Sequence, residues 1–427
     1  MLRSSPVATP LRGTLRCPGD KSLSHRAVIL GTLARGETRV GGWLEAGDTM
    51  ATLGACRKLG AEVHFGDDGL RIRGTGGRLR VPGETLDLGN SGTGARLLLG
   101  VLAGQSFAVT LTGDRSLRSR PMRRVTEPLA RMGARFETAP GGCLPITVRG
   151  GELRGAHHRL PVASAQVKSA LLLAGIQASG VTGVFEPLRS RDHTERMLPM
   201  FGCSVPAGRV LRVQRCELQG CNLSLPGDFS SAVFPLAAAL LVPGSRVEVV
   251  GVGINPTRSG WLEAVRLMGG RVAVAETSAG HEPAARLEAI SGPLTAIALP
   301  EAEVVRGIDE LPLLMALAAC ARDVTRIRGA AELRVKESDR LAAMCEALRR
   351  LGIDCQERAD GADIRGGHVR GGAVDARGDH RVAMSLAVLG TIARSPIEIG
   401  GADAIATSYP AFVGDLSRLG ARLEWRR

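Results

Sequence analysis

The sequence predicts an α/β protein of two domains, each built from three repeated units, because two patterns recur six times in its 427 residues. A chain of this length is also too long for one ordinary core. In the first pattern, an amphipathic stretch ends in an apolar residue and a glycine, and a short strand-like segment follows. The glycines are spaced by 73, 69, 67, 83 and 68 residues and are Gly60, Gly133, Gly202, Gly269, Gly352 and Gly420.

Each of these glycines predicts the end of a helix, since glycine readily adopts the left-handed conformation that stops one. Alternating apolar residues after the glycines predict strands, and Gly-rich turns then lead to second strands. The expected first strands are 61–65, 134–137 and 421–425, and the expected second strands are 70–73 and 145–148.

In the second pattern, a polar cluster opens a stretch that is apolar on nearly every face, which is typical of a buried helix. The clusters lie near residues 21, 90, 164, 228, 309 and 379. They are rich in Asn, Asp and Ser, the preferred N-caps. One interpretation is simply six well-capped core helices. The other adds function: helix N-termini attract anions. If the repeats pack alike, all six helix starts point the same way, and with three repeats per domain two triads of starts could face each other across a cleft.

The two patterns together predict six βαβαββ-like units, three in each domain, with an electropositive site between the domains. The period is too long, and the copies too divergent, for a solenoid.

The composition favours a site for small polyanions over nucleic-acid binding. The net charge is +13, but aromatic residues make up only 3% of the chain. Nucleic-acid binding usually combines basic patches with stacking aromatics or a recognisable module.

Cysteine and histidine usage argues against zinc sites and disulfides, because the nine cysteines and eight histidines form no Cys-x-x-Cys or His-x-x-x-His pair. Buried thiols in a reducing cytosol are expected. The first 17 residues contain no apolar signal segment. The longest apolar run, near 233–243, is far shorter than the ~18 residues of a membrane span. We therefore expect a soluble, cytoplasmic protein.

Lysine is rare in this chain, with four lysines against 51 arginines. A lysine that persists against such a bias is a candidate for a role that needs a compact ammonium able to lose a proton. Lys21, Lys168 and Lys336 lie in polar, Ser-bearing runs, whereas Lys58 lies in an ordinary amphipathic stretch and is expected at the surface.

The first helix start combines Lys21, Ser22 and Arg26, and the last two are neighbours on one helix face. This set suits a phosphate or carboxylate. A P-loop is rejected because Asp20 stands where glycine must precede the lysine. At the second start, Gly92 allows a ligand to approach the backbone closely.

Acidic and basic residues alternate in 334–340, which we expect to form a helix start opened by Lys336. One interpretation is a surface run of ion pairs. The apolar residues that follow favour a cleft, where such a set is costly unless it does chemistry. Asp309 lies at another helix start, where a general base would help, and Arg381 adds a cation at the last one. In the loop 111–125, most of the five arginines are expected to be solvated.

Segments 18–26, 88–93 and 334–340 together resemble the 3-phosphoshikimate 1-carboxyvinyltransferase (EPSP synthase) family. Segments 164–170 and 190–195 resemble its bacterial class II form, and the likeness is collinear from about residue 7 to 425.

The resemblance implies the two-domain enolpyruvyl transferase fold, an inside-out α/β barrel with buried parallel helices. The domains would be 20–227 and 1–19 plus 228–427, with the active site in the cleft between them. The implied protein is a cytoplasmic transferase and a monomer, with no cofactor or metal and no nucleic-acid or membrane partner.

The implied reaction transfers the enolpyruvyl group of phosphoenolpyruvate to the 5-hydroxyl of 3-phosphoshikimate and releases phosphate. This is a step of the shikimate pathway, which leads to chorismate and aromatic amino acids. The family is the target of glyphosate, for which Gly92 leaves room.

The resemblance also implies the site residues. Those for 3-phosphoshikimate are Lys21, Ser22, Arg26, Ser164, Gln166, Asp309 and Lys336, with Ser190 and Arg191 as additional contacts. Those for phosphoenolpyruvate are Lys21, Gly92, Arg120, Gln166, Arg340 and Arg381. Asp309 would take the proton of the 5-hydroxyl, Glu337 would exchange protons with the methylene carbon, and Lys21 would complete the catalytic set.

The sequence departs from the family pattern at Thr407, where many members have lysine. Lys168 is typical of the class II form but receives no role. It lies two residues from Gln166 on a helix, so the two side chains do not share a face.

Three alternatives stay open. The sister enzyme UDP-N-acetylglucosamine 1-carboxyvinyltransferase usually has a reactive Cys or Asp in the loop 111–125. Here that loop has no Cys, and its one Asp, Asp114, lies at the base of the loop. The sister enzyme also usually reads Lys-Asn where this chain has Lys21-Ser22. A basic RNA-binding or RNA-processing protein of related fold would bind RNA with a steep salt dependence. An inactive relative is disfavoured by the intact acid–base set.

Overall fold

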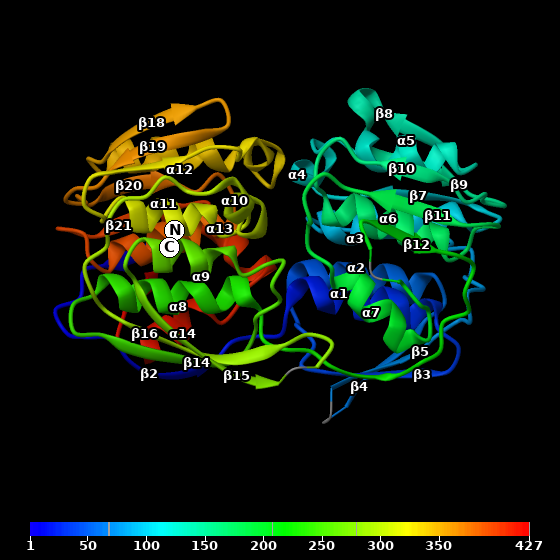
Figure 1. Cartoon of the computed structure of the whole chain (residues 1–427), viewed down its shortest axis with the longest axis horizontal. Helices are drawn as coiled ribbons and strands as arrows, with labels where there is room; N and C mark the ends of the chain where they lie inside the picture. Colours follow the sequence, from blue (N-terminus) through cyan, green and yellow to red (C-terminus); the bar gives the residue numbers. More distant parts are fainter. Residues whose placement is uncertain (67–68, 207, 279, 427) are drawn as a thin grey trace. The chain divides into compact units, whose positions relative to one another are not determined.

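The computed structural model describes residues 1–66, 69–206, 208–278 and 280–426. The chain divides into two compact units, each with its own core (Figure 1). Unit 1 comprises Met1–Pro18 and Pro226–Arg427, and unit 2 comprises Gly19–Leu225. The fold class is α/β, as predicted. No helix among the described residues is long and apolar enough to cross a membrane.

The second repeat of unit 2 shows the βαβαββ plan most clearly. Strands β6 and β7 are parallel, and helix α3 makes the crossover that such a pair requires. Strand β9 then pairs antiparallel with both β7 and β8. The elements are β6 (Leu86–Asp87), α3 (Gly92–Ala103), β7 (Ala108–Thr112), α4 (Arg115–Arg118), α5 (Arg123–Arg131), β8 (Arg135–Ala139), η1 (Pro140–Gly142) and β9 (Cys143–Arg149).

The first repeat of unit 2 follows the same plan, and the third follows it in part, because its sheet has three strands among the described residues where the predicted unit has four. The first repeat contains α1 (Lys21–Leu33), β3 (Glu37–Gly41), α2 (Gly47–Lys58), β4 (Glu62–Gly66) and β5 (Gly69–Arg73). Its remaining strand, β13 (Asn222–Ser224), comes from the far end of the unit and pairs parallel with β3. The third repeat contains β10 (His157–Arg159), α6 (Ala165–Gly175), β11 (Thr182–Phe185), α7 (His193–Met197), η2 (Leu198–Phe201) and β12 (Val210–Val213).

Unit 1 contains the other three repeats. Two of them take a strand from the N-terminal segment, and the remaining one has a sheet of three strands among the described residues where the predicted unit has four. Strand β2 pairs parallel with β14, and β1 lies between β21 and β22. The fourth repeat contains β2 (Arg12–Arg16), α8 (Phe229–Leu241), β14 (Arg246–Gly253), α9 (Gly260–Leu267), β15 (Arg271–Ser278) and β16 (Ala284–Ile290). The fifth contains α10 (Glu301–Arg306), α11 (Leu311–Ala318), β17 (Val324–Ile327), η3 (Ala331–Val335), α12 (Arg340–Arg350), β18 (Asp354–Arg358) and β19 (Gly361–Arg365). The sixth contains β20 (Gly372–Asp375), α13 (His380–Gly390), β21 (Ile397–Gly400), η4 (Ala402–Thr407), α14 (Phe412–Arg418), β22 (Arg422–Trp425) and β1 (Leu2–Ser5).

The predicted helix ends are confirmed, because all six repeat glycines have positive φ, from 79° at Gly269 to 119° at Gly133. The five expected strands are also found, as β4, β8, β22, β5 and β9. The third repeat differs in detail: α7 is short and continues as the 3₁₀ helix η2, which contains Pro199. Proline has no N–H to donate to the ladder of a continuing α-helix.

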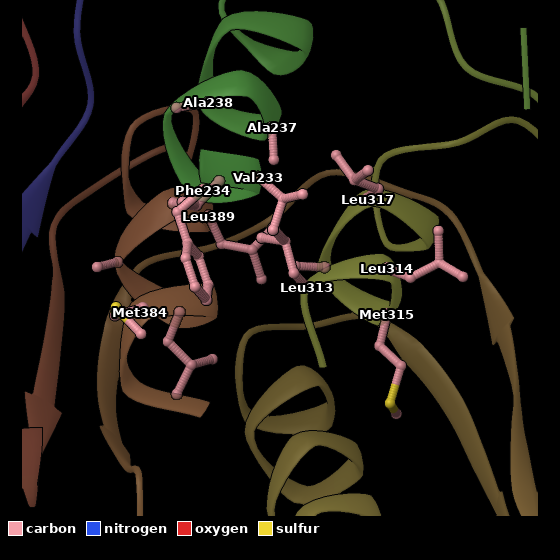
Figure 2. Close-up of a cluster of buried hydrophobic side chains, with 14 of the residues drawn as sticks. Val233, Phe234, Ala237, Ala238, Leu313, Leu314, Met315, Leu317, Met384 and Leu389 are labelled. Carbon is pink, nitrogen blue, oxygen red and sulfur yellow. The ribbon is translucent and has the colours of Figure 1, made fainter. Parts of the chain in front are cut away.

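The six apolar stretches form buried helices, three in each unit: α1, α3 and α6, and α8, α11 and α13. Figure 2 shows their packing in unit 1, where Phe234 of α8, Leu313 of α11 and Leu389 of α13 lie together. Five of the six starts have a side-chain N-cap, namely Asp20, Ser91, Ser164, Asp228 and Asp379. The sixth, Glu310, has no such hydrogen bond.

Candidate active site

In unit 2 the starts of α1, α3 and α6 meet. Arg26 of α1 donates from Nη2 to Ser169 Oγ of α6 at 2.8 Å. Gln166 of α6 donates from Nε2 to Thr93 Oγ1 of α3 at 3.0 Å and accepts from Arg96 Nη1 at 2.9 Å. The predicted common direction of the three helix starts is therefore confirmed within this unit.

Lys21 and Arg26 are both held in place by neighbours. Lys21 Nζ lies 3.0 Å from Asp48 Oδ2 at the start of α2. Arg26 is buried; its Nη1 donates to the Ser22 carbonyl at 2.9 Å and its Nε donates to Thr194 Oγ1 at 2.7 Å. Holding a cation before a ligand arrives lowers the entropy lost on binding.

His25, which lies between these two cations in the sequence, is buried. Its Nδ1 shares a hydrogen bond of 2.9 Å with Thr52 Oγ1. Burial, together with the charges of Lys21 and Arg26, holds the pKa of His25 well below its ordinary value. The ring is therefore neutral at physiological pH.

Gly92 begins α3 beside two guanidinium groups. A Cβ at this position would lie 2.9 Å from Nη1 of both Arg120 and Arg96. Arg120 is itself fixed, because Nη2 donates to Ser116 Oγ at 3.0 Å and to the side-chain oxygen of Asn90. Of the five arginines in the loop 111–125, Arg120 alone is classed as buried, so the expectation that most are solvated is met.

In unit 1, Arg340 gathers three carboxylates around one guanidinium. Its Nη1 lies 3.1 Å from Asp309 Oδ1, its Nε lies 2.8 Å from Asp379 Oδ2, and its Nη2 contacts Glu337. Lys336 Nζ lies 3.5 Å from Asp309 Oδ1. Burial lowers the pKa of Arg340, but the three carboxylates outweigh it and raise the pKa above its ordinary value. The two predicted proton-transfer groups, Asp309 and Glu337, thus share one permanent cation.

A second buried network joins the starts of α8, α11 and α13. Glu310 contacts the Ser230 hydroxyl and lies 3.7 Å from Arg381 Nη1. Ser230 Oγ also accepts from Arg258 Nη2 at 2.8 Å. These contacts explain why Glu310 does not cap its own helix: its carboxylate is used between helices. The three helix starts of unit 1 therefore also point the same way.

One prediction about this unit is wrong. Lys336 does not open a helix; it follows the 3₁₀ helix η3, and α12 begins at Arg340 with Asp339 as its N-cap. The Asp339 side chain accepts from Ala342 N at 3.0 Å, and a short polar side chain suits this position better than lysine.

The remaining predicted residues have clear positions. Ser164 caps α6 and Ser190 is buried in the loop before α7, with Arg191 next to it. Thr407 ends η4, and its hydroxyl donates to the Ala404 carbonyl at 2.7 Å. Lys168 and Gln166 contact different neighbours, as their spacing predicts.

Sequence reasoning missed several residues that hold the site together: Asp48, Arg96, Thr194, Glu310 as a link between helices and Asp379. Asp379 and Arg96 lie within segments that the patterns single out, but nothing local distinguishes a cap from an ion-pair partner. Among the described residues, no group of His, Cys, Asp and Glu side chains could hold a metal ion.

The family profile described as EPSP synthase (3-phosphoshikimate 1-carboxyvinyltransferase) matches residues 7–416. The chain belongs to the EPSP synthase family. The 3-phosphoshikimate 1-carboxyvinyltransferase of Methylococcus capsulatus is 50% identical over 420 residues, which are 97% of this chain and 96% of the relative. The enzyme of that name from Alkalilimnicola ehrlichii is 51% identical over 410 residues, 94% of this chain and 92% of the relative.

Solved structures agree with this family. The EPSP synthase of Acinetobacter baumannii superimposes with a TM-score of 0.88 at 42% identity, covering 100% of this chain and 99% of that one. The enolpyruvyl transferase NikO of Streptomyces tendae has a TM-score of 0.77 at 20% identity, covering 99% and 98%, and shows the shared fold alone. The predicted enolpyruvyl transferase fold and family are confirmed.

Proposed function

We propose that this chain is a 3-phosphoshikimate 1-carboxyvinyltransferase of the shikimate pathway. It transfers the 1-carboxyvinyl group of phosphoenolpyruvate to the 5-hydroxyl of 3-phosphoshikimate, giving 5-O-(1-carboxyvinyl)-3-phosphoshikimate and phosphate. The observation that carries the proposal is about half identity to curated enzymes of this name along nearly the whole chain. The Arg340 cluster supports it, because it places two carboxylates on one cation.

The proposed chemistry needs an acid and a base together. C2 of the enol phosphate in phosphoenolpyruvate becomes electrophilic when C3 gains a proton, which Glu337 supplies. The 5-hydroxyl attacks C2 as Asp309 takes its proton, giving a tetrahedral intermediate. Glu337 then takes a proton back from C3 as the bond between C2 and the phosphate oxygen breaks, which forms the product, and the proton that Asp309 took leaves with the phosphate. Arg340, whose charge is permanent, keeps both carboxylates oriented through these proton transfers.

The substrate contacts follow the helix starts. In unit 2, Lys21, Ser22, Arg26, Ser164 and Gln166 hold 3-phosphoshikimate, with Ser190 and Arg191 beside them. Lys21, Gly92, Arg120 and Gln166 hold phosphoenolpyruvate. From unit 1, Asp309 and Lys336 complete the first set, and Arg340 and Arg381 complete the second. Helix N-termini and arginines suit the phosphate and carboxylate of each substrate.

We further propose that the two domains, 20–227 and 1–19 with 228–427, contribute to one active site, because the residues assigned to each substrate come from both. The chain would act in the cytoplasm as a monomer, without nucleic acid. Its nine cysteines are all free thiols, which is consistent with a reducing compartment.

A two-substrate assay tests the function. Purified protein should release inorganic phosphate only when 3-phosphoshikimate and phosphoenolpyruvate are both present. Each substrate alone is the control. Phosphate release with UDP-N-acetylglucosamine in place of 3-phosphoshikimate would overturn the assignment, and so would no release with any acceptor.

A further inference from the structure

Lys168 differs from the other lysines in its environment. Its side chain is 1% exposed, against 12% for Lys21, 23% for Lys336 and 38% for Lys58. A buried ammonium is costly unless it is paired and hydrogen-bonded. Lys168 Nζ contacts Glu186 Oε1 at 2.6 Å, Glu195 Oε1 at 2.8 Å and the Ser190 carbonyl at 3.2 Å.

The two glutamates lie at opposite ends of one loop, which we name the 186–195 loop. Glu186 directly follows strand β11, and Glu195 lies in the first turn of helix α7. Lys168 belongs to α6. A single ammonium therefore ties both ends of this loop to the helix that also carries Gln166 and Ser169.

The middle of the 186–195 loop is fixed by the same cluster. Glu186 accepts a hydrogen bond from the Ser190 backbone N at 2.9 Å and another from the Ser190 hydroxyl at 2.6 Å. Ser190 is buried although residues 187–189 are exposed. The turn at Ser190 and Arg191 is thus held toward α6.

The loop also reaches Arg26 of α1. Thr194, next to Glu195, accepts from Arg26 Nε at 2.7 Å and shares a hydrogen bond of 2.7 Å with Ser169 Oγ. Ser169, next to Lys168, accepts from Arg26 Nη2. The guanidinium of Arg26 is therefore held on one side by α6 and on another by the end of the loop that Lys168 anchors.

We propose that Lys168 is a positioning residue for 3-phosphoshikimate: it fastens the 186–195 loop to α6 and thereby orients Arg26 and the Ser190–Arg191 turn toward that substrate. This inference rests on the proposed function, which assigns Arg26 to 3-phosphoshikimate. It also explains why lysine persists here in a chain with 51 arginines. A compact ammonium donates to three acceptors in a small buried space, which a planar guanidinium does not fit.

The test replaces the ammonium by an apolar group of similar length, Lys168→Met. The KM and Kd for 3-phosphoshikimate should rise about tenfold or more, as expected for loss of charge-assisted hydrogen bonds. The KM for phosphoenolpyruvate should change by less than about twofold, because Arg26 and the Ser190–Arg191 turn are not among the residues assigned to that substrate. Lys58→Met, which removes an exposed lysine paired with Glu84 at 3.0 Å, is the matched control and should behave as wild type.

A second readout does not depend on activity. The Ser190 amide, which donates to Glu186, should exchange its hydrogen faster in Lys168→Met than in wild type, measured by hydrogen–deuterium exchange without substrate. If wild-type protein releases no phosphate from the substrate pair, the proposed function fails. Unchanged exchange at Ser190, or an unchanged KM for 3-phosphoshikimate in an active enzyme, overturns the role of Lys168.

Two further variants separate positioning from general destabilisation. Ile72→Ala removes buried side-chain volume from β5 and should lower the unfolding midpoint without raising the KM for 3-phosphoshikimate. If it raises that KM as much as Lys168→Met does, the effect is general and the proposal is overturned. If Lys168→Met does not fold, Glu195→Gln keeps the side-chain shape and should raise the same KM by a smaller factor. No rise in that variant overturns the proposal.

Discussion

At the scale of single residues, Arg340 explains how acidic groups accumulate at the proposed reaction centre. Three carboxylates contact its guanidinium through different nitrogen atoms, which lysine with one ammonium cannot reproduce. Because arginine stays protonated, Arg340 would keep its positive charge through the proton transfers proposed for Asp309 and Glu337.

The first residue-scale prediction concerns these two carboxylates. Asp309→Ala and Glu337→Ala should each lower kcat by about 10²-fold or more, since each removes a group to which the proposed mechanism assigns a proton transfer. Binding of 3-phosphoshikimate should stay measurable by calorimetry, because the residues of unit 2 proposed to contact it are unchanged. Near-normal kcat in either variant would contradict the assigned role.

The second concerns Gly92, where a Cβ would lie 2.9 Å from both Arg120 and Arg96. In Gly92→Ala these flexible side chains must shift, so the KM for phosphoenolpyruvate should rise about tenfold, equivalent to one lost polar contact. Stability should change little. Gly54→Ala in α2 is the control, because a Cβ there meets nothing within 4 Å. Equal KM values for both variants would contradict the prediction.

At the scale of elements, the three buried helices of each unit pack through their apolar bodies and are also linked by polar contacts at their starts. In unit 2, His25 of α1 contacts Thr52 of α2, which lies 3.3 Å from the Ser91 hydroxyl that caps α3. In unit 1, Arg340 contacts Asp379, which caps α13, and Glu310 at the start of α11 contacts Ser230 at the start of α8. Apolar burial is non-directional, so directional polar contacts at the helix starts help to set the register of the helices.

The neutral state of His25 gives an element-scale prediction. Its folded pKa is lowered, so below about pH 6.5 the unfolded chain binds a proton that the folded chain does not. Stability should therefore fall as the pH drops from 7 through 6.5 toward the folded pKa, by up to about 1.4 kcal/mol per pH unit. Urea unfolding at pH 7.5, 6.5 and 5.5 measures this slope.

His25→Asn is the control for that experiment. It removes the titrating ring but leaves the other ionisable groups, so their contribution cancels in the comparison. The variant should lose less stability between pH 7.5 and 5.5 than wild type does. Parallel pH profiles would show that His25 does not contribute.

At the scale of the whole molecule, the assigned substrate contacts are divided between two compact units. Lys21 and Arg26 belong to unit 2, and Asp309 and Arg340 belong to unit 1. If one reaction uses both sets, substrate binding must favour a state in which both units reach the same ligand.

The prediction at this scale is a more compact molecule with substrates. Small-angle scattering should give a smaller radius of gyration with 3-phosphoshikimate and a phosphoenolpyruvate analogue than without them. The Arg26→Met variant, which should bind 3-phosphoshikimate weakly, should show a smaller change at the same concentrations. An unchanged radius in wild type under saturating conditions would argue against a shared site.

The fold was predictable to the extent that its signals are local. The six glycine helix ends and five of the helix caps follow from single residues and their immediate neighbours. The start of α12 was misjudged, because Lys336, Asp339 and Arg340 are all polar and only the backbone decides which of them begins the helix. In the site, motifs singled out Arg26 and Arg340 as candidates but did not show that Thr194 contacts the first and Asp379 the second.

The sequence by itself therefore determined the repeats, the ends of their helices and the family, since each depends on short-range patterns or on ordered motifs. Only the tertiary structure decided which side chains contact one another. Arg26 contacts Thr194 across 168 positions of sequence, Arg340 contacts Asp379 across 39, and Lys168 closes a loop between two glutamates. Such pairs depend on how buried helices pack against one another, and packing brings together groups that no local spacing connects.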